Sequence, residues 1–193
     1  MSTITIEQQA AIAAKVDGMT LPSGLGDEHS ACSIAAINLA LNGRLTDKIP
    51  DCMSEVIGKW IIGVQDAMPD EMRNSVRWKS LLPLAAGTGR EHEQERSVLI
   101  IKWMWGTVLP TLQPLADREG FGPQWMRMTT ERTTKAAWAA ARAAWAAAAE
   151  AEAEAEAEAA AAARARAAAR AAAWDQFNPC ELLERLIAVG ETK

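Results

Sequence analysis

His29, Cys32 and Cys52 are of the residue types that bind metal ions. His29 and Cys32 form an H-x-x-C pair, and Cys52 lies twenty residues further on. Zinc accepts Cys and His ligands, and two ligands three residues apart can share one ion. The pair is irregular, and His92 and Cys180 could complete the ligand set in space. Buried free thiols are the commoner state of such cysteines. A contact between Cys32 and Cys52 without metal is therefore the preferred interpretation, and a zinc site the alternative.

A glycine-rich turn forms a second pattern. Gly87, Thr88 and Gly89 precede Arg90, and Arg96 follows within two helical turns. Glycine amides beside arginines can hold an anion. The segment lacks the Lys-Ser/Thr ending and the preceding strand of a phosphate loop. We expect a turn between two helices, and these five residues are where an anionic ligand would bind.

Residue types that could carry out catalysis are few. The two histidines and three cysteines could form a nucleophilic pair, but no flanking signature accompanies one. A metal-dependent hydrolase could instead use carboxylates, which occur at Asp66, Asp70, Glu71, Glu93 and Glu95. Carboxylates at helix starts usually serve the helix dipole and solvation. The sequence therefore favours a non-enzymatic binding protein without a cofactor over a metal-dependent helical hydrolase.

The charge balance argues against nucleic acid as a partner. The 193 residues carry a formal net charge of -5, and phosphate backbones are bound by concentrated basic surfaces. Arg73, Arg77 and Lys79 form a weak basic cluster that is typical of a helix surface.

Sequence features that direct proteins to membranes or for export are not apparent. No segment approaches the roughly 18 apolar residues of a transmembrane helix. The N-terminal residues lack the basic and apolar regions of a secretory signal. Three cysteines do not make a disulfide scaffold. These observations predict a cytoplasmic protein.

The hydrophobic pattern is helical almost throughout and predicts an all-α protein. Thr5 with Gln8 resembles a capping box, Gly43 ends the second helix, and Asn178 with Pro179 begins the last one. We expect a multi-helix globular domain at 1–125, with its strongest core helix at 93–108. The second domain, 126–193, should contain one very long Ala/Trp-rich helix from Thr129 to Phe177 and a short C-terminal amphipathic helix. The expected helices span about 5–16, 30–41, 51–68, 70–84, 93–108, 129–177 and 179–189.

The segment from Ala136 to Ala173 contains only Ala, Trp, Arg and Glu. Alanine is the strongest helix former, and nothing in the segment breaks a helix. On a straight helix Trp138, Trp145 and Trp174 would share one face. Removing each tryptophan side chain from water would contribute a few kcal/mol of free energy. We therefore expect this face of the helix to form an interface.

The charges in this segment are arranged in two blocks, and a second copy could neutralise them. Five glutamates from Glu150 to Glu158 come first, and three arginines follow. An antiparallel copy of the helix would place arginines opposite glutamates. One register matches Glu158 with Arg164, Glu156 with Arg166 and Glu152 with Arg170, and a neighbouring register fits nearly as well. The alternatives are packing against the chain's own N-terminal part, and a solvated spacer helix.

The order of several short motifs resembles an uncharacterised group of alanine-rich helical proteins of bacteria and bacteriophages. The motifs are Cys32 in a small-residue helix, residues 52–57 with Trp60, 68–71, 82–84 leading into Gly87-Thr88, 95–97 before Trp103, and the C-terminal Ala/Trp/Arg run. The resemblance implies no activity. A phage setting would fit a small accessory protein, such as a host-defence inhibitor, that binds a host factor or sequesters a small signal.

Together these observations favour a homo-oligomeric binding protein. Its other partner would be a host protein or an anionic nucleotide-like ligand near the glycine-rich turn. The alternatives are the metal-dependent hydrolase described above and an acidic decoy that mimics nucleic acid with Glu150 to Glu158.

Overall fold

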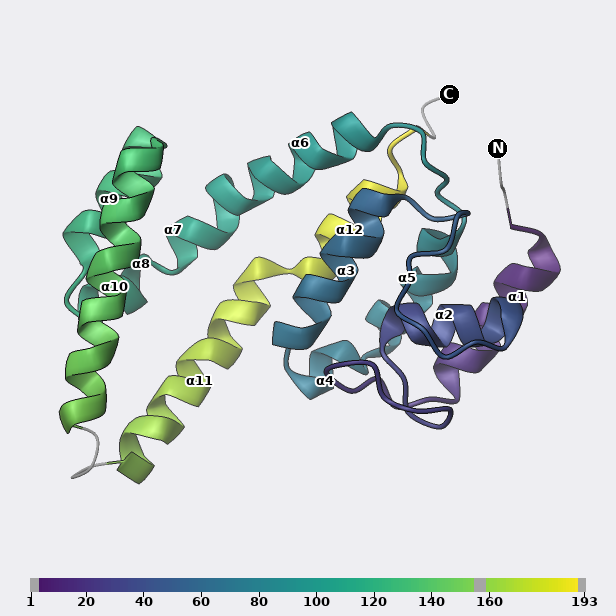
Figure 1. The fold of residues 1–193 in the computed structure, drawn as a ribbon, viewed down its shortest axis with the longest axis horizontal. Coiled ribbons are helices and arrows are strands. Elements are labelled where there is room, and N and C mark those ends of the chain that lie inside the picture. The colour runs from purple at the N-terminus through teal and green to yellow at the C-terminus, as the bar shows by residue number, and fades with distance from the viewer. Residues whose placement is uncertain (1–3, 155–158, 191–193) are drawn as a thin grey trace. The chain divides into compact units, whose positions relative to one another are not determined.

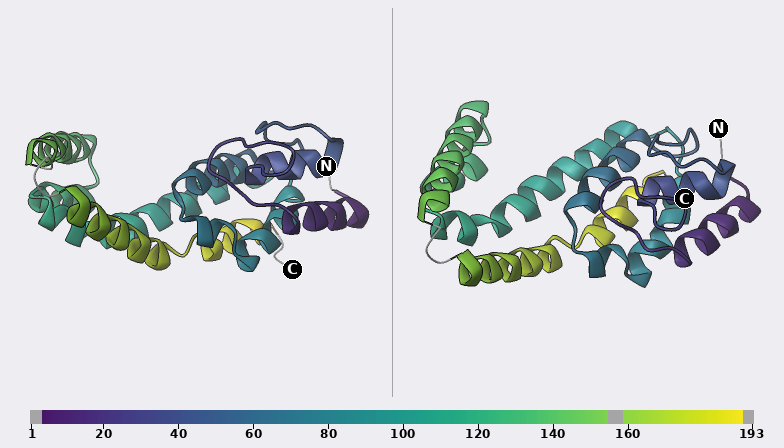
Figure 2. Two further views of the ribbon diagram at one scale, coloured as in Figure 1. Left: turned by 90° about the horizontal axis from the view of Figure 1, so that it is seen from below. Right: turned by 60° about the horizontal axis from the view of Figure 1, so that its bottom comes forward.

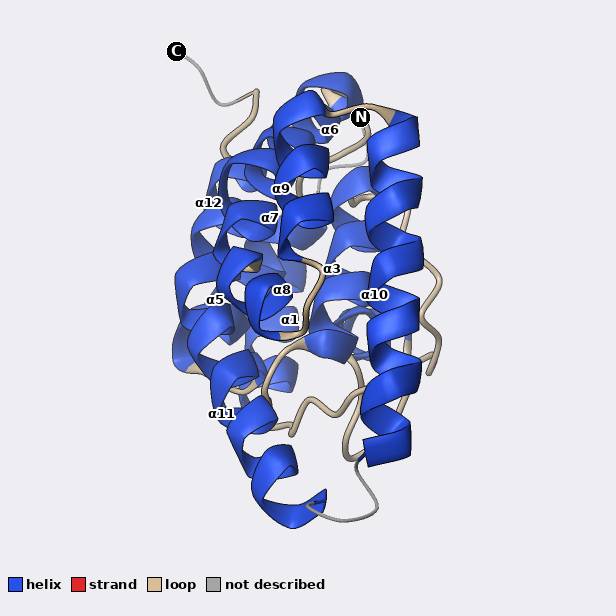
Figure 3. Cartoon of the chain, turned by 90° about the vertical axis from the view of Figure 1, so that its left-hand side faces the viewer, coloured by secondary structure: helices blue, strands red, loops and turns tan. Residues whose placement is uncertain are grey.

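The computed structural model describes residues 4–154 and 159–190, and within this part the side chains of 149–166 are not described. Every regular element in the described part is a helix, as Figure 3 shows. A long loop at 18–32 contains two isolated β-bridges. The all-α class predicted from the hydrophobic pattern is confirmed.

The chain forms two compact units, and the first is built from both ends of the sequence. One unit comprises Met1–Ile100 together with Asn178–Lys193, and the other comprises Ile101–Phe177. This division differs from the predicted domains, 1–125 and 126–193. The reason is that the last helix returns to the first unit and buries its leucines there, so the second unit is an insertion.

In the part of the chain that the structure describes, the first unit contains six complete helices and most of a seventh. They are α1 (Ile6–Asp17), α2 (Ser33–Asn42), α3 (Glu55–Ala67), α4 (Asp70–Arg73), α5 (Val76–Ala86), α12 (Pro179–Ile187) and the beginning of α6 (Glu93–Trp103), labelled in Figure 1.

The core of the first unit lies where these helices meet. Helix α1 packs against α2 and α5, and α12 packs against α3 and α5; Figure 2 shows α1 and α2 side by side. Trp78 is fully buried at the centre, where its indole nitrogen donates to the Ser33 hydroxyl at 3.1 Å. The buried aliphatic side chains of this unit come from α1, α2, α3, α5 and α12: Ile12, Ile34, Ile37, Ile57, Ile61, Leu82, Leu182 and Leu183.

The helix ends predicted from short motifs are confirmed. Thr5 and Gln8 form a capping box at the start of α1. Gly43 ends α2 in the left-handed conformation, with φ of 69°. The side chain of Asn178 accepts a hydrogen bond from the amide of Glu181 at the start of α12. These signals are local, so they act in the same way in any tertiary setting.

The prediction that the helix at 93–108 is the strongest core helix is wrong. Val98, Ile101 and Met104 are exposed, and Arg96 is the buried residue of α6. Three of the periodic apolar residues are therefore outside any core, whereas Trp105 packs against the small core of the second unit. After Trp103 the helix continues through a π-helical turn, η1 (Met104–Val108).

The second unit consists of short helices followed by the alanine-rich ones. They are η1, α7 (Leu109–Thr111), α8 (Gln113–Arg118), α9 (Gly122–Glu131), α10 (Thr134–Glu154) and α11 (Ala159–Phe177). Its small core is formed by Met128 of α9 with Ala136 and Ala140 of α10. Trp105 and Trp125 pack against this core, and the indole of Trp125 donates to the Leu109 carbonyl at 2.9 Å.

The single helix predicted from Thr129 to Phe177 is not confirmed. Arg132 adopts a left-handed conformation with φ of 53° and ends α9, and its guanidinium lies over the Trp105 ring. The longest helix in the described part is α10, with 21 residues. Residues 155–158, between α10 and α11, lie outside the description. The face shared by Trp138 and Trp174 requires one straight helix, whereas the structure places them on α10 and α11.

Candidate functional site

The glycine-rich turn predicted to bind an anion joins α5 to α6 in the first unit. The amide of Gly87 donates to the Leu84 carbonyl, that of Thr88 to Ala85, and that of Gly89 to Cys52. The Thr88 hydroxyl accepts from the amide of Ser54 at 3.0 Å. The three amides are thus hydrogen-bonded within the chain rather than directed at a ligand.

Arg96 is buried and binds carbonyl oxygens of the protein itself. It is 1% exposed. Its guanidinium donates to five backbone carbonyls, three before α6, one in the last turn of α12 and one just after it: Thr88, Gly89, Glu91, Leu186 and Val189. Burial lowers the pKa of this guanidinium, although an arginine remains charged at neutral pH. Arg96 therefore joins the turn to the last helix.

Arg90 and Glu93 hold the same turn against α3. Arg90 forms ion pairs with Asp51 at 3.4 Å and Glu55 at 3.1 Å. The Glu93 carboxylate accepts from the Ser54 hydroxyl at 2.6 Å and from the Glu55 amide at 2.8 Å. A carboxylate at this position satisfies free amides and the dipole at the start of α3.

The geometry therefore favours a simple connection between two helices over an anion-binding site. The donors of Gly87, Thr88, Gly89, Arg90 and Arg96 that the structure describes are engaged with the protein itself. The anion near the start of α3 is the protein's own Glu93. This role of Glu93 is not apparent in the sequence, because its contacts to Ser54 and Glu55 span almost forty residues.

A cavity of about 620 Å³ lies beside this turn. Its apolar walls come from α5 and α12 and include Leu81, Leu84 and Ile187. Thr88 and His92 contribute polar atoms, and His92 adopts a left-handed conformation with φ of 63°. The volume lies in the range of small-molecule sites, about 300–1,000 Å³. Gln9, Glu91, Arg96 and Glu184 also line the cavity, so its wall is both apolar and charged.

A second buried arginine, Arg73, fixes the long loop at 18–32. It is 3% exposed. It donates to the carbonyls of Leu21, Gln65 and Met68 and pairs with Asp70. The interpretation of Arg73 as a surface residue is wrong.

The other two members of the predicted basic cluster are also engaged. Lys79 donates to the Met19 carbonyl at 2.7 Å, and Arg77 forms a bidentate ion pair with Glu184 of α12. The predicted basic cluster of Arg73, Arg77 and Lys79 thus forms hydrogen bonds and ion pairs within the first unit.

The structure does not bring His29, Cys32 and Cys52 together as a metal site. In the described part of the chain, no group of three or more His, Cys, Asp or Glu side chains could hold a metal ion. Cys32 and Cys52 are buried free thiols, whereas His29 is exposed. Burial raises the pKa of both thiols, so they are neutral and poor nucleophiles at pH 7. His29, Cys32 and Cys52 therefore do not form a metal site in the described part of the chain.

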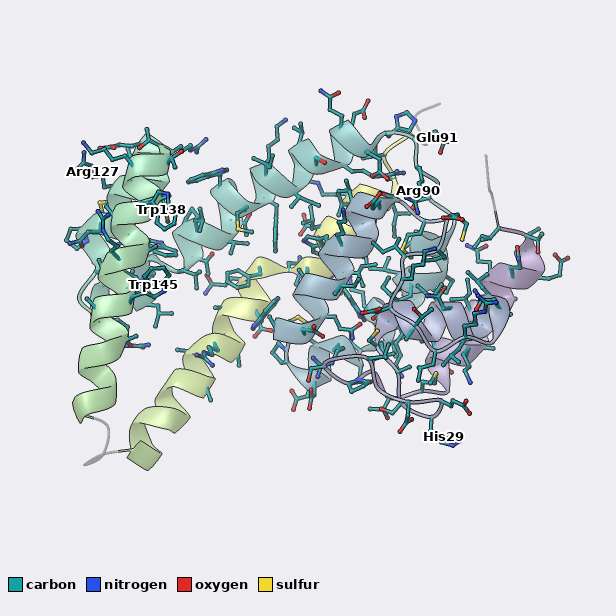
Figure 4. All side chains as sticks on the ribbon, viewed as in Figure 1. His29, Arg90, Glu91, Arg127, Trp138 and Trp145 are labelled. Carbon is teal, nitrogen blue, oxygen red and sulfur yellow. The ribbon has the colours of Figure 1, made fainter. Side chains whose placement is uncertain are left out.

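One face of α10 exposes two large aromatic side chains. Trp138 is 57% exposed and Trp145 is 67% exposed, and Figure 4 labels both on this helix. The two residues are seven positions apart, so they lie on the same side of the helix. Lys135, three positions before Trp138, and Arg142, between the two tryptophans, are exposed as well. The face therefore combines two large aromatic groups with two cations.

The other residues of the predicted interface are placed differently. Trp174 is partly buried and packs edge-on against Phe177, with ring centroids 5.3 Å apart. Arg170 is exposed on α11. Glu156 and Glu158 lie outside the described residues, and the side chains of Glu152, Arg164 and Arg166 are not described. The predicted pairing of glutamates with arginines stays a prediction.

Comparisons with known proteins identify no relative of this chain. No protein-family model matches it, and no curated protein and no solved structure shows significant similarity. The resemblance to alanine-rich helical proteins of bacteria and phages therefore stays an expectation. In the described residues, no helix combines the length and apolar character needed to cross a membrane.

Proposed function

We propose that this protein is a non-enzymatic, cytoplasmic, homo-oligomeric binding protein, and that the exposed face of α10 is its interface. The observation that carries the proposal is the exposure of Trp138 and Trp145 on one side of this helix. Burying a large apolar side chain is worth about 1.5–3 kcal/mol. An interface built on two such side chains therefore has a substantial driving force.

The opposite face of α10 supports this proposal, because it is already used. Ala136 and Ala140 are buried against α9 in the core of the second unit. Packing of α10 within its own unit thus leaves the tryptophans outward. Exposed tryptophans with arginine nearby are typical of the centres of protein interfaces.

Native mass spectrometry of the wild-type protein and of a variant with Trp138→Ala and Trp145→Ala tests the proposal. We expect the wild type to form a dimer or larger species, and the double variant to dissociate with a Kd raised about 100-fold or more. Both changes are at exposed sites, so circular dichroism should show the same helix content. Val76→Ala, at an 82% exposed position of the first unit, is the matched control and should leave assembly unchanged. Equal masses for the double variant and the wild type would contradict the proposal.

The alternative functions have less support from the geometry. An anionic nucleotide-like ligand would need donors that the turn at 87–96 uses internally. An acidic decoy depends on Glu150 to Glu158, whose side chains are not described. A host protein, as the phage setting would suggest, could bind the same α10 face, and it becomes the leading partner if the wild type is monomeric.

A further inference from the structure

The cavity beside the glycine-rich turn is lined by residues of the first unit alone. Its apolar wall consists of Leu81 and Leu84 of α5, Ile187 of α12 and Val189 just after that helix. Leu84 is 45% exposed, so apolar surface is left uncovered at this wall. A cavity of about 620 Å³ is large enough to hold the apolar body of a small molecule.

The hydrogen-bond donors around the cavity are used by the protein itself. The three amides of the turn at 87–89 donate to backbone carbonyls. The guanidinium of Arg96 donates to five carbonyls. Glu184 lines the cavity too, but its carboxylate is neutralised by the bidentate ion pair with Arg77. The described part of the lining therefore offers an anionic ligand no free cation.

The Glu91 carboxylate, by contrast, is available to a ligand. Glu91 lies in the turn before α6, where Figure 4 labels it, and its side chain is exposed. Arg96 binds the backbone carbonyl of Glu91. Among the described residues the Glu91 carboxylate forms no ion pair. It is therefore the unneutralised charge of the described lining.

Two further side chains place polar atoms at the cavity. Gln9 of α1 contributes an amide group, whose oxygen can accept a hydrogen bond. The ring of His92 packs against Gly190, where an added Cβ would lie 2.7 Å from a ring carbon. His92 itself has φ of 63°, and non-glycine residues in this left-handed region cluster at ligand sites. The polar side of the cavity is thus rich in acceptors.

We propose that this cavity binds a small molecule that combines an apolar body with a primary ammonium group, and that Glu91 is the partner of the ammonium. An ammonium has a positive charge and three donors, which suit a carboxylate and a nearby amide oxygen. The apolar body lies against Leu81, Leu84 and Ile187. The charge is opposite to that of the anion expected from the sequence, because the donors of the turn are engaged internally. The site is independent of the α10 interface, which belongs to the other unit.

Titration calorimetry of the full chain with octylamine and with octanoate at low salt tests the proposal. The two probes carry alkyl chains of nearly equal length and opposite charges at neutral pH. We expect octylamine to bind with a Kd of about 1 mM or lower. Octanoate should bind at least about fivefold more weakly, since an ion pair at an exposed carboxylate is worth up to about that factor.

Glu91→Gln should raise the Kd of octylamine about fivefold and should not weaken the binding of octanoate. Glu71→Gln is the matched control, because it makes the same change of charge at an exposed residue of α4 that does not line the cavity. It should alter the Kd of octylamine less than about twofold, because salt screens distant charges. Tighter or equal binding of octanoate to the wild type would overturn the assignment of an ammonium ligand, and so would an unchanged octylamine Kd in Glu91→Gln.

Nuclear magnetic resonance of the ¹⁵N-labelled wild type locates the bound octylamine. The amide signals of Gly87, Gly89 and Gly190, which line the cavity, should shift on its addition. Ala188→Trp introduces a large side chain at an exposed lining position and should weaken octylamine at least about tenfold, with circular dichroism as the check on folding. Signal shifts confined to other surfaces, or no binding of octylamine to the wild type, would overturn the site without affecting the proposal for α10.

Discussion

At the scale of single residues, the first unit depends on two buried arginines that bind carbonyl oxygens. Arg96 connects the turn before α6 to the end of α12, and Arg73 connects the loop at 18–32 to the end of α3. A guanidinium has five donors in a fixed plane, so it can satisfy several carbonyls that no regular element pairs. The positive charge is thus used for hydrogen bonding inside the protein.

We expect Arg96→Met to lower the free energy of unfolding by about 3 kcal/mol or more, because it leaves buried carbonyls without donors. Arg96→Lys keeps the charge but lacks the planar set of five donors. It should therefore recover only part of the lost free energy of unfolding. Urea unfolding followed by circular dichroism measures both. Arg90→Met removes exposed ion pairs and should cost less than about 1 kcal/mol. A similar cost at both arginines would contradict the role assigned to Arg96.

At the scale of elements, the start of α3 is completed by a residue from another helix. Ser54 caps α3 locally by accepting from the Ile57 amide, and Glu93 of α6 binds Ser54 and the amides of Glu55 and Val56. The cap therefore links α3 to α6 through charge-assisted hydrogen bonds.

We expect Glu93→Gln to lower the free energy of unfolding by about 1 kcal/mol, because a neutral amide interacts less with these donors and with the helix dipole. Glu95→Gln, at an exposed position of the same helix, is the matched control and should change stability by less than about 0.5 kcal/mol. Thermal or urea unfolding distinguishes the two. An equal effect at both positions would show that Glu93 acts only through surface charge.

At the scale of the whole molecule, the second unit is inserted between α6 and α12 of the first. Its beginning and end lie together, because the Trp103 indole donates to the Phe177 carbonyl at 2.8 Å and the two rings are in contact. Inserted units commonly have neighbouring ends, which lets the host unit fold around them. The first unit therefore does not require a particular length of the inserted alanine-rich segment.

We expect removal of one Glu-Ala dipeptide from residues 155–158 to leave the unfolding midpoint of the first unit within about 2 °C of the wild type, as for a surface change. Leu183→Ala in α12 is the contrasting change, since Leu183 is fully buried, and it should cost about 2–5 kcal/mol. Differential scanning calorimetry measures both. A large shift from the dipeptide deletion would show that the length of the segment is coupled to the first unit.

The sequence by itself determined the helical class, the helix ends marked by Thr5, Gly43 and Asn178, and the aromatic residues of α10. Those features follow from propensities, caps and periodicity, which act over a few residues. It did not determine the burial of Arg73 and Arg96, the cap formed by Glu93, or the return of α12 to the first unit. Each of these depends on contacts between residues far apart along the chain, and only the tertiary structure brings such residues together. The exposure of Trp138 and Trp145 belongs to this second group, because the packing of Ala136 and Ala140 against α9 decides which side of α10 faces outward.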